Sequence, residues 1–243
     1  LVRQWAAVLA VSMTSLAVAA LYLAFADAYD FYSAAVAKRT VRHKGRVGSV
    51  FVYLTRYLMA NKSYLINTVG LCAIACFLPL LFDEFQGLNM FPIGLAILCL
   101  NTPICTLLSC DPDLEQAIRM LPGQAGRFCR KYCLFIFAVN SIVASIYLCS
   151  WQIVNGGLNF VHVGTLLIFA LQSAILSVML EWKHPIRDWK TESDLWHHPR
   201  KYIVPLAMLL IAAFVGTYPS VLWIWSAVLL MECGILLYWA RRE

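Results

Sequence analysis

Long apolar runs, separated by short polar connections, dominate the sequence. There are seven of them, at residues 5–25, 65–82, 91–109, 132–154, 158–180, 202–217 and 221–239. A helix needs roughly 20 residues to cross a hydrocarbon core of about 30 Å, and each run has that length or nearly so. The pattern therefore predicts an all-α polytopic membrane helix bundle, in which the sixth run is the shortest span.

The positively charged residues support this division and predict an orientation. The 19 Lys and Arg residues fall at Arg3 and in the segments 38–62, 119–131, 183–201 and 241–242. The other connections, 83–89, 155–157 and 216–220, contain none. Because basic and bare connections alternate, the positive-inside rule places the basic connections and the C-terminus in the cytoplasm. We expect a multi-pass protein of the cell membrane with its first end outside.

Composition agrees with a membrane protein and argues against nucleic acid as a partner. Hydrophobic residues make up 61% of the chain and charged residues 13%, against about 25% charged in soluble domains. The formal net charge of +6 is confined to a few connections, so membrane topology explains it. The nine cysteines include no C-x-x-C pair, and we interpret them as small packing residues.

The first run differs from the others and predicts an additional span. It is rich in alanine, and a basic linker that ends at residue 48 separates it from the rest. Because the chain starts at Leu1, we expect further residues upstream. Apolar residues at helical spacing in 49–64 predict an interfacial helix in the headgroup plane. Residues 1–48 are thus predicted as an additional helix with its linker, and 49–243 as a six-span domain.

The connection after the third run carries a short amphipathic helix. Asp111 can cap the helix, Pro112 fits its first position, and Pro122-Gly123 should end it. An apolar stripe at helical spacing joins Leu114 to Leu121. We predict a helix over about 111–122 that lies at the membrane surface with one face free for a partner.

The residues of this helix carry a resemblance to a known family. Leu114-Glu115-Gln116, followed by Leu121-Pro122 and by Lys131, resembles the ABC-2 family of transporter permeases, although Pro112-Asp113 stands where Gly-Thr is common. The resemblance covers about residues 49–243. It implies a coupling helix that docks on a cytoplasmic ABC ATPase subunit through Asp113, Leu114, Glu115, Gln116, Ile118, Arg119 and Leu121.

The same resemblance implies the function and the partners. The chain would be the permease subunit of an ATP-driven exporter, pair with a second permease half, and move an amphipathic or hydrophobic peptide, lipid or drug. The sequence has no phosphate-binding G-x-x-x-x-G-K-[ST] segment, so ATP and Mg²⁺ would be bound by the partner ATPase and this chain would need no cofactor.

Glu232 is the one carboxylate well inside a predicted span. Acids within a membrane are costly and usually face a bundle interior or a cavity, so Glu232 is a candidate for the translocation pathway. A protonated Glu232 that is hydrogen-bonded to a neighbouring helix is the alternative. His197-His198 with Asp194 and Glu192 could suggest a metal site, but adjacent histidines point in different directions, and we predict no metal.

Two other functions remain open from the residues. A non-catalytic membrane scaffold or assembly subunit would show the same spans, and only the 111–122 helix argues against it. A membrane enzyme that modifies lipids would need ionisable groups clustered at one membrane depth, and the predicted spans offer too few. We therefore predict a transporter subunit with no catalytic residues.

Overall fold

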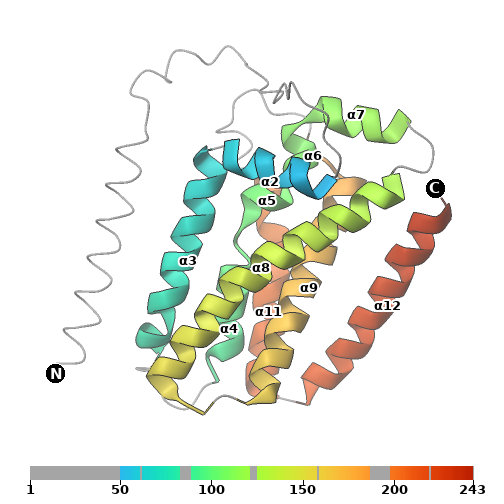
Figure 1. The fold of residues 1–243 in the computed structure, drawn as a ribbon. Coiled ribbons are helices and arrows are strands. Elements are labelled where there is room, and N and C mark those ends of the chain that lie inside the picture. The colour runs from blue at the N-terminus through green and yellow to red at the C-terminus, as the bar shows by residue number, and fades with distance from the viewer. Residues whose placement is uncertain are drawn as a thin grey trace.

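A computed structural model describes residues 50–60, 62–82, 89–120, 125–157, 159–186, 198–218 and 220–242. Every regular element in these ranges is a helix, which confirms the all-α part of the prediction. Figure 1 shows α2 (Val50–Ala60), α3 (Lys62–Phe82), α4 (Phe91–Leu98), α5 (Thr102–Cys105), α6 (Leu107–Cys110), α7 (Pro112–Met120), α8 (Ala125–Asn155), α9 (Phe160–Lys183), α11 (Ile203–Thr217) and α12 (Val221–Arg242). A short 3-10 helix, η1 (Pro199–Tyr202), precedes α11. The predicted span at 5–25 lies outside the described residues.

Among the described residues, four segments are long and apolar enough to cross a membrane. They are Tyr64–Phe82, Ala125–Asn155, Phe160–Lys183 and Pro199–Thr217, and α12 adds the shorter apolar stretch Val221–Ile235. Many large apolar side chains on these helices point outward, including Ile142, Ile153 and Trp223. An outer surface of this kind is stable next to lipid.

The predicted span at 91–109 is not a single helix. It is divided into α4, α5 and α6, with a break after Leu98 and another at Thr106. Pro103, the second residue of α5, has no amide hydrogen and is favoured in a first helical turn, so a new helix begins there. The Tyr132 phenol accepts a hydrogen bond from the Leu107 amide at 3.2 Å and donates one to the Ile104 carbonyl at 2.7 Å. These two bonds satisfy backbone groups that the second break leaves unpaired.

Asn101 lies in the first break, between α4 and α5, and contacts α3. Its side chain is fully buried between α4 and α5. Its Oδ1 accepts hydrogen bonds from Asn67 Nδ2 at 3.2 Å and from Thr68 Oγ1 at 3.4 Å, both on α3. The broken helix is therefore held to α3 by polar contacts inside an otherwise apolar bundle.

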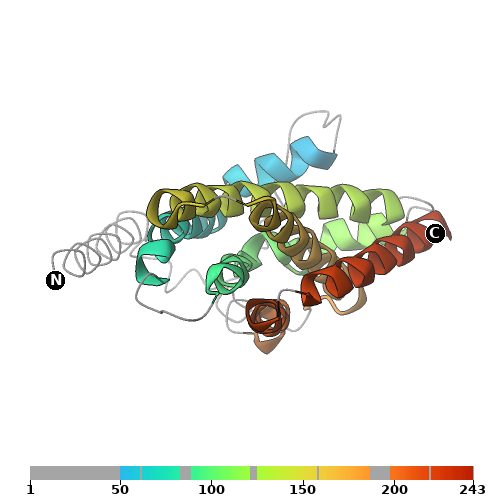
Figure 2. The ribbon, with the colours of Figure 1, turned by 90° about the horizontal axis from the view of Figure 1, so that it is seen from below.

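Helix α8 forms the centre of the bundle. It packs most extensively against α3 and α9, and α4 packs against α11. Seen from below in Figure 2, α2 lies on the opposite side of α8 from α4 and α11. Phe51 of α2 meets Phe135 of α8 edge to face, with ring centroids 5.4 Å apart. The helix predicted at 49–64 is observed as α2, which ends at Ala60, and the last predicted residues belong to α3, which begins at Lys62.

Two apolar cores lie one after the other along α8. The first surrounds the fully buried Tyr132 and includes residues of α2, α6, α7 and the C-terminal half of α9. The second surrounds Tyr147, which stacks on Phe91 of α4 with ring centroids 5.4 Å apart. Gly94 permits this stack, because a Cβ atom at that position would overlap the phenol ring of Tyr147.

Candidate functional site

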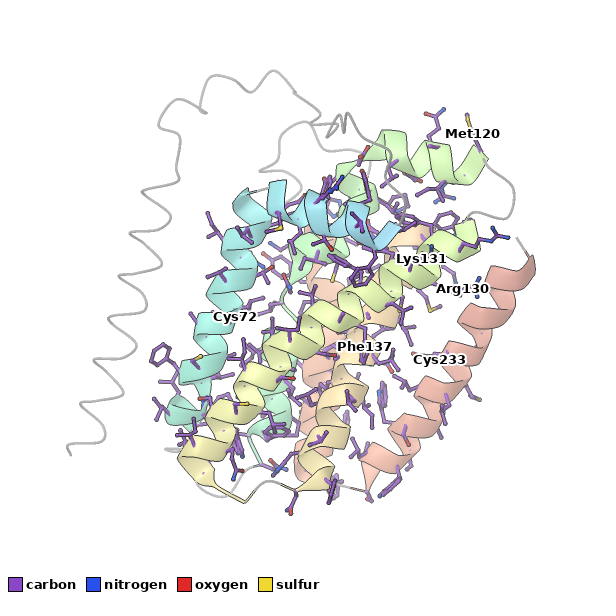
Figure 3. The ribbon with its side chains drawn as sticks, viewed as in Figure 1. Cys72, Met120, Arg130, Lys131, Phe137 and Cys233 are labelled. Atoms are coloured by element: carbon purple, nitrogen blue, oxygen red, sulfur yellow. The ribbon has the colours of Figure 1, made fainter. Side chains whose placement is uncertain are left out.

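Helix α7 lies at the end of the bundle where α2 lies and where α8 begins (Figure 1). The first turns of α8 carry the exposed residues Arg127, Arg130 and Lys131. Figure 3 shows Met120 at the far end of α7 and Arg130 near the start of α8, both at this end of the molecule. The amphipathic helix and the basic residues at the start of α8 therefore lie at the same end of the bundle.

Asp111 caps α7 as the sequence predicts. Its Oδ1 accepts a hydrogen bond from the Leu114 amide at 3.1 Å, which satisfies one of the free amides of the first turn. Its Oδ2 accepts a second bond from the Tyr53 phenol of α2 at 3.3 Å. Burial, with a further contribution from the Asp111 charge, raises the pKa of Tyr53 above its ordinary value, so the phenol stays protonated and donates. The cap thus ties α7 to α2.

The two faces of α7 have different environments. Ile118 is buried and Leu114 is half-buried, and both pack against the core around Tyr132. Gln116, Ala117 and Met120 are exposed, and 70% of Met120 is accessible. Leu114 and Ile118 of the predicted stripe therefore face the chain's own bundle, and the surface that remains for a partner includes Gln116, Ala117 and Met120.

Glu115 and Arg119 bind α7 to the end of α9. Arg119 Nε lies 2.8 Å from Glu115 Oε1, and Arg119 Nη2 donates to the Trp182 carbonyl at 2.7 Å. The guanidinium also lies 4.3 Å from the centre of the Trp182 ring, in a cation–π contact. Glu115 is only 4% exposed, so this carboxylate is used inside the chain. We call Glu115, Arg119 and Trp182 the α7 anchor.

A second polar cluster surrounds Glu181, the residue before Trp182, and it was not predicted from the sequence. Glu181 of α9 is fully buried, and its Oε1 accepts hydrogen bonds from Ser109 of α6 and from Arg200 Nη2 of η1, the latter at 3.3 Å. Ser109 Oγ in turn accepts bonds from the Ile186 amide at 2.8 Å and from Arg200 Nη1 at 3.3 Å. We call Ser109, Glu181 and Arg200 the Glu181 network.

The Glu181 network joins α6 to α9 and η1, which lie more than 70 residues further along the chain. A buried carboxylate is stable only when an opposite charge and hydrogen bonds compensate for its lost hydration, and Arg200 with Ser109 supplies both. A cavity of about 20 Å³, lined in part by Arg200, Cys105 and Ser177, lies beside the Arg200 side of the network. This volume is near the minimum that one water molecule requires. The only sequence signal was an acid at the end of one apolar run and a base at the start of the next.

Glu232 lies at a contact between α9 and α12. Gln172 of α9 donates from Nε2 to Glu232 Oε2 at 2.5 Å. The Oε1 of the same Gln172 accepts a hydrogen bond from the Trp225 indole of α12 at 3.2 Å. Trp225 and Glu232 thus lie on one face of α12, and a single amide binds both. The Glu232 residue as a whole is partly exposed.

Several predicted site residues have no described side chain or lie outside the described residues. Leu121 lies outside them, and so do Glu192, Asp194 and His197 of the possible metal cluster. Asp113 belongs to α7, but its side chain is not described. His198 Nδ1 accepts a hydrogen bond from the Arg200 amide at 3.3 Å, which caps η1. Within the described part of the chain no group of His, Cys, Asp and Glu could hold a metal ion.

Comparison with known proteins identifies no relative. No protein-family model, no curated protein and no solved structure matches the chain. The functional interpretation therefore depends on the site's own geometry and on the sequence of α7.

Proposed function

We propose that this chain is the membrane permease subunit of an ATP-driven exporter of the ABC-2 type. The observation that carries the proposal is α7: a capped amphipathic helix at the basic end of the bundle, with Gln116, Ala117 and Met120 exposed and its other face fixed to α9. A membrane protein driven by a soluble motor needs a rigid surface of this kind, because a loosely held helix would absorb the motion of the motor.

The α7 anchor and the Glu181 network supply the proposed mechanical path. Closure of the ATPase pushes α7, and Arg119 passes the displacement to Trp182 at the end of α9. Glu181 is the residue before Trp182, so the same displacement reaches α6 through Ser109 and η1 with α11 through Arg200. Motion at one helix thereby reorients several spans at once and exchanges inward and outward access.

The proposed topology has six spans in residues 49–243. α3, α8, α9 and α11 supply four of them, α4 to α6 cross together as a broken helix, and α12 supplies the last. The proposed partners are a cytoplasmic ABC ATPase, which binds ATP and Mg²⁺, and a second permease half. The basic end, with the C-terminus, faces the cytoplasm of a cell membrane. The substrate class is an amphipathic or hydrophobic peptide, lipid or drug, in keeping with a largely apolar bundle.

Binding of the ATPase tests the role of α7. The chain is purified from its native host with its partners, as wild type and as the double variant Gln116→Arg/Met120→Glu. We expect an ATPase to co-purify with the wild type, and the double variant to lose it about tenfold, since central exposed residues dominate interface energy. Both side chains are exposed, so the fold should be retained.

The matched control is Gln152→Arg, the same substitution at an exposed position near the other end of α8. It should leave the co-purified ATPase unchanged. Recovery of equal ATPase with the double variant would exclude α7 as the docking surface. A wild-type chain that recruits no ATPase would exclude the exporter itself.

A non-catalytic scaffold is the second candidate function. The observation that favours it is the burial of Ile118 and Glu115 against the chain's own bundle, which would also suit a helix that only anchors its connection at the membrane surface. An intact complex with other membrane subunits and no nucleotide hydrolase would support this alternative.

Glu232→Gln tests the proposed translocation pathway. Glutamine has the same size and still accepts the hydrogen bond from Gln172, so we expect unchanged assembly and thermal stability. If the ionisable group itself serves transport, ATP-driven transport into inverted vesicles should fall about tenfold, as expected for a functional acid within the membrane. Unchanged transport would show that Glu232 has only a structural role between α9 and α12.

A further inference from the structure

Three exposed cations lie on one face at the start of α8. Arg127, Arg130 and Lys131 are exposed, whereas Phe128 and Tyr132 beside them are buried. Intervals of three and four residues place the three charges on the same side of a helix. Figure 3 shows Arg130 and Lys131 at this end of the bundle. We call Arg127, Arg130 and Lys131 the α8 basic face.

The chain does not neutralise this face within the described residues. The ion pairs there are Arg119–Glu115 and Arg200–Glu181, and neither involves the α8 basic face. The four acids whose side chains are described bind other groups, and they are Asp111, Glu115, Glu181 and Glu232. Cations in the first turns of a helix also oppose its macrodipole, so their position does not stabilise α8 itself. An anionic ligand would remove both costs.

The same face becomes apolar one turn further along α8. Leu134 follows Lys131 by three residues and is 59% exposed. Ile142, two turns beyond Leu134, is exposed as well. Exposed aliphatic side chains on a membrane helix lie against acyl chains, whereas exposed cations lie at the level of the headgroups. The change from charge to apolar surface between Lys131 and Leu134 therefore indicates the boundary between these two layers.

Helix α2 indicates the same level independently. It lies across the end of the bundle where α8 begins (Figure 1), and its amphipathic sequence predicts a position in the headgroup plane. Its Phe51 contacts Phe135, the residue after Leu134. Lys131 and Arg127 precede Phe135 by four and eight residues, which is about 6 and 12 Å along a helix. Since the headgroup layer is about 5–7 Å deep and α8 is inclined, the α8 basic face lies at headgroup depth.

We propose that the α8 basic face binds the headgroup of an anionic phospholipid, whose acyl chains lie along Leu134. A phosphate with net negative charge accepts charge-assisted hydrogen bonds from the two guanidinium groups and from the Lys131 ammonium. A single lipid molecule therefore matches both the charges and the apolar turn next to them. A soluble protein could match the charges alone, because Leu134 lies at the depth of the acyl chains. This inference does not depend on the proposed exporter function.

Photo-cross-linking of lipids tests the proposal. The purified full-length protein is placed in phosphatidylcholine nanodiscs that contain a small fraction of a probe with a diazirine at the start of one acyl chain. The probe is either phosphatidylglycerol or phosphatidylcholine, and mass spectrometry measures labelling of the peptide that contains Leu134. One basic residue near a membrane surface raises binding of anionic lipid about fivefold, so we expect the anionic probe to label this peptide at least about tenfold more. In about 1 M salt, this preference should fall several-fold, because the screening length is then only about 3 Å.

Two double variants show whether the attraction belongs to this face. Arg130→Gln/Lys131→Gln should reduce the preference for the anionic probe several-fold. The matched control, Arg56→Gln/Lys183→Gln, also removes two exposed charges, on α2 and at the end of α9, and it should keep the preference within about twofold. All four side chains are exposed, so the fold should be retained.

Three results would overturn the proposal. The first is equal labelling by the two probes in the wild type. The second is an equal loss of preference in both double variants, because total charge would then attract the lipid. The third is loss of a co-purified ATPase in Arg130→Gln/Lys131→Gln with unchanged lipid labelling, which would make a protein the occupant of the α8 basic face.

Discussion

Replacement of Arg200 by methionine should destabilise the protein by about 3–5 kcal/mol, the usual cost of leaving one partner of a buried ion pair uncompensated. Arg200 Nη2 lies 3.3 Å from Glu181 Oε1, and the Glu181 side chain is fully buried. Without the guanidinium, Glu181 retains only the Ser109 hydroxyl as a partner in the Glu181 network. The measurement is thermal unfolding in lipid nanodiscs, where a loss of this size lowers the midpoint by about 10 °C.

Two further variants make this result specific to the ion pair. Arg127→Met is the same substitution at an exposed position of α8, and it should change the midpoint by less than about 2 °C, since exposed substitutions are usually near neutral. The double variant Glu181→Met/Arg200→Met removes both charges and should recover most of the lost stability. If the double variant is as unstable as Arg200→Met alone, the unpaired charge is not the cause.

The substitution Gly94→Ala should destabilise the second core by about 1–3 kcal/mol, the range found for overpacking. The new methyl group would overlap the phenol group of Tyr147, a fully buried residue of α8 that stacks on Phe91 of α4. Relief requires a shift of the ring or of α4, and either change disturbs this stack. The measurement is again the unfolding midpoint in nanodiscs.

Gly70→Ala and Gly164→Ala are matched controls for Gly94→Ala. Both glycines lie within helices, α3 and α9, and a methyl group at either position would meet no atom within 4 Å. Because alanine is the better helix former, these variants should be neutral or slightly more stable. Equal destabilisation by all three substitutions would contradict the close approach of α4 to Tyr147.

The parts of the fold that were predictable are those that local chemistry determines. The predicted helix at 111–122 occurs as Pro112–Met120, because Asp111 supplies the cap and a proline fits the first turn. The long apolar runs at 65–82, 132–154 and 158–180 correspond to α3, α8 and α9. In each case, a regular pattern within one segment carries the information that decides the structure.

The contacts that give the candidate site its form were not predictable, because they join distant segments. The family resemblance implies that Arg119 contacts a partner, yet its guanidinium donates to the Trp182 carbonyl, 63 residues away in this chain. The pairing of Glu181 with Arg200 depends on the path of the chain between α9 and η1. The spacing of apolar residues along the sequence does not determine that path. The two breaks in 91–109 were missed for the same reason, since side chains of α3 and α8 compensate for them.

The bridge from Tyr132 determines how the broken helix α4 to α6 can move. One phenol holds the Ile104 carbonyl and the Leu107 amide together, so the two short helices can separate only by stranding both groups in an apolar interior. We therefore expect the break at Thr106 to have little freedom as a hinge, because a change in its geometry would break one or both of these hydrogen bonds.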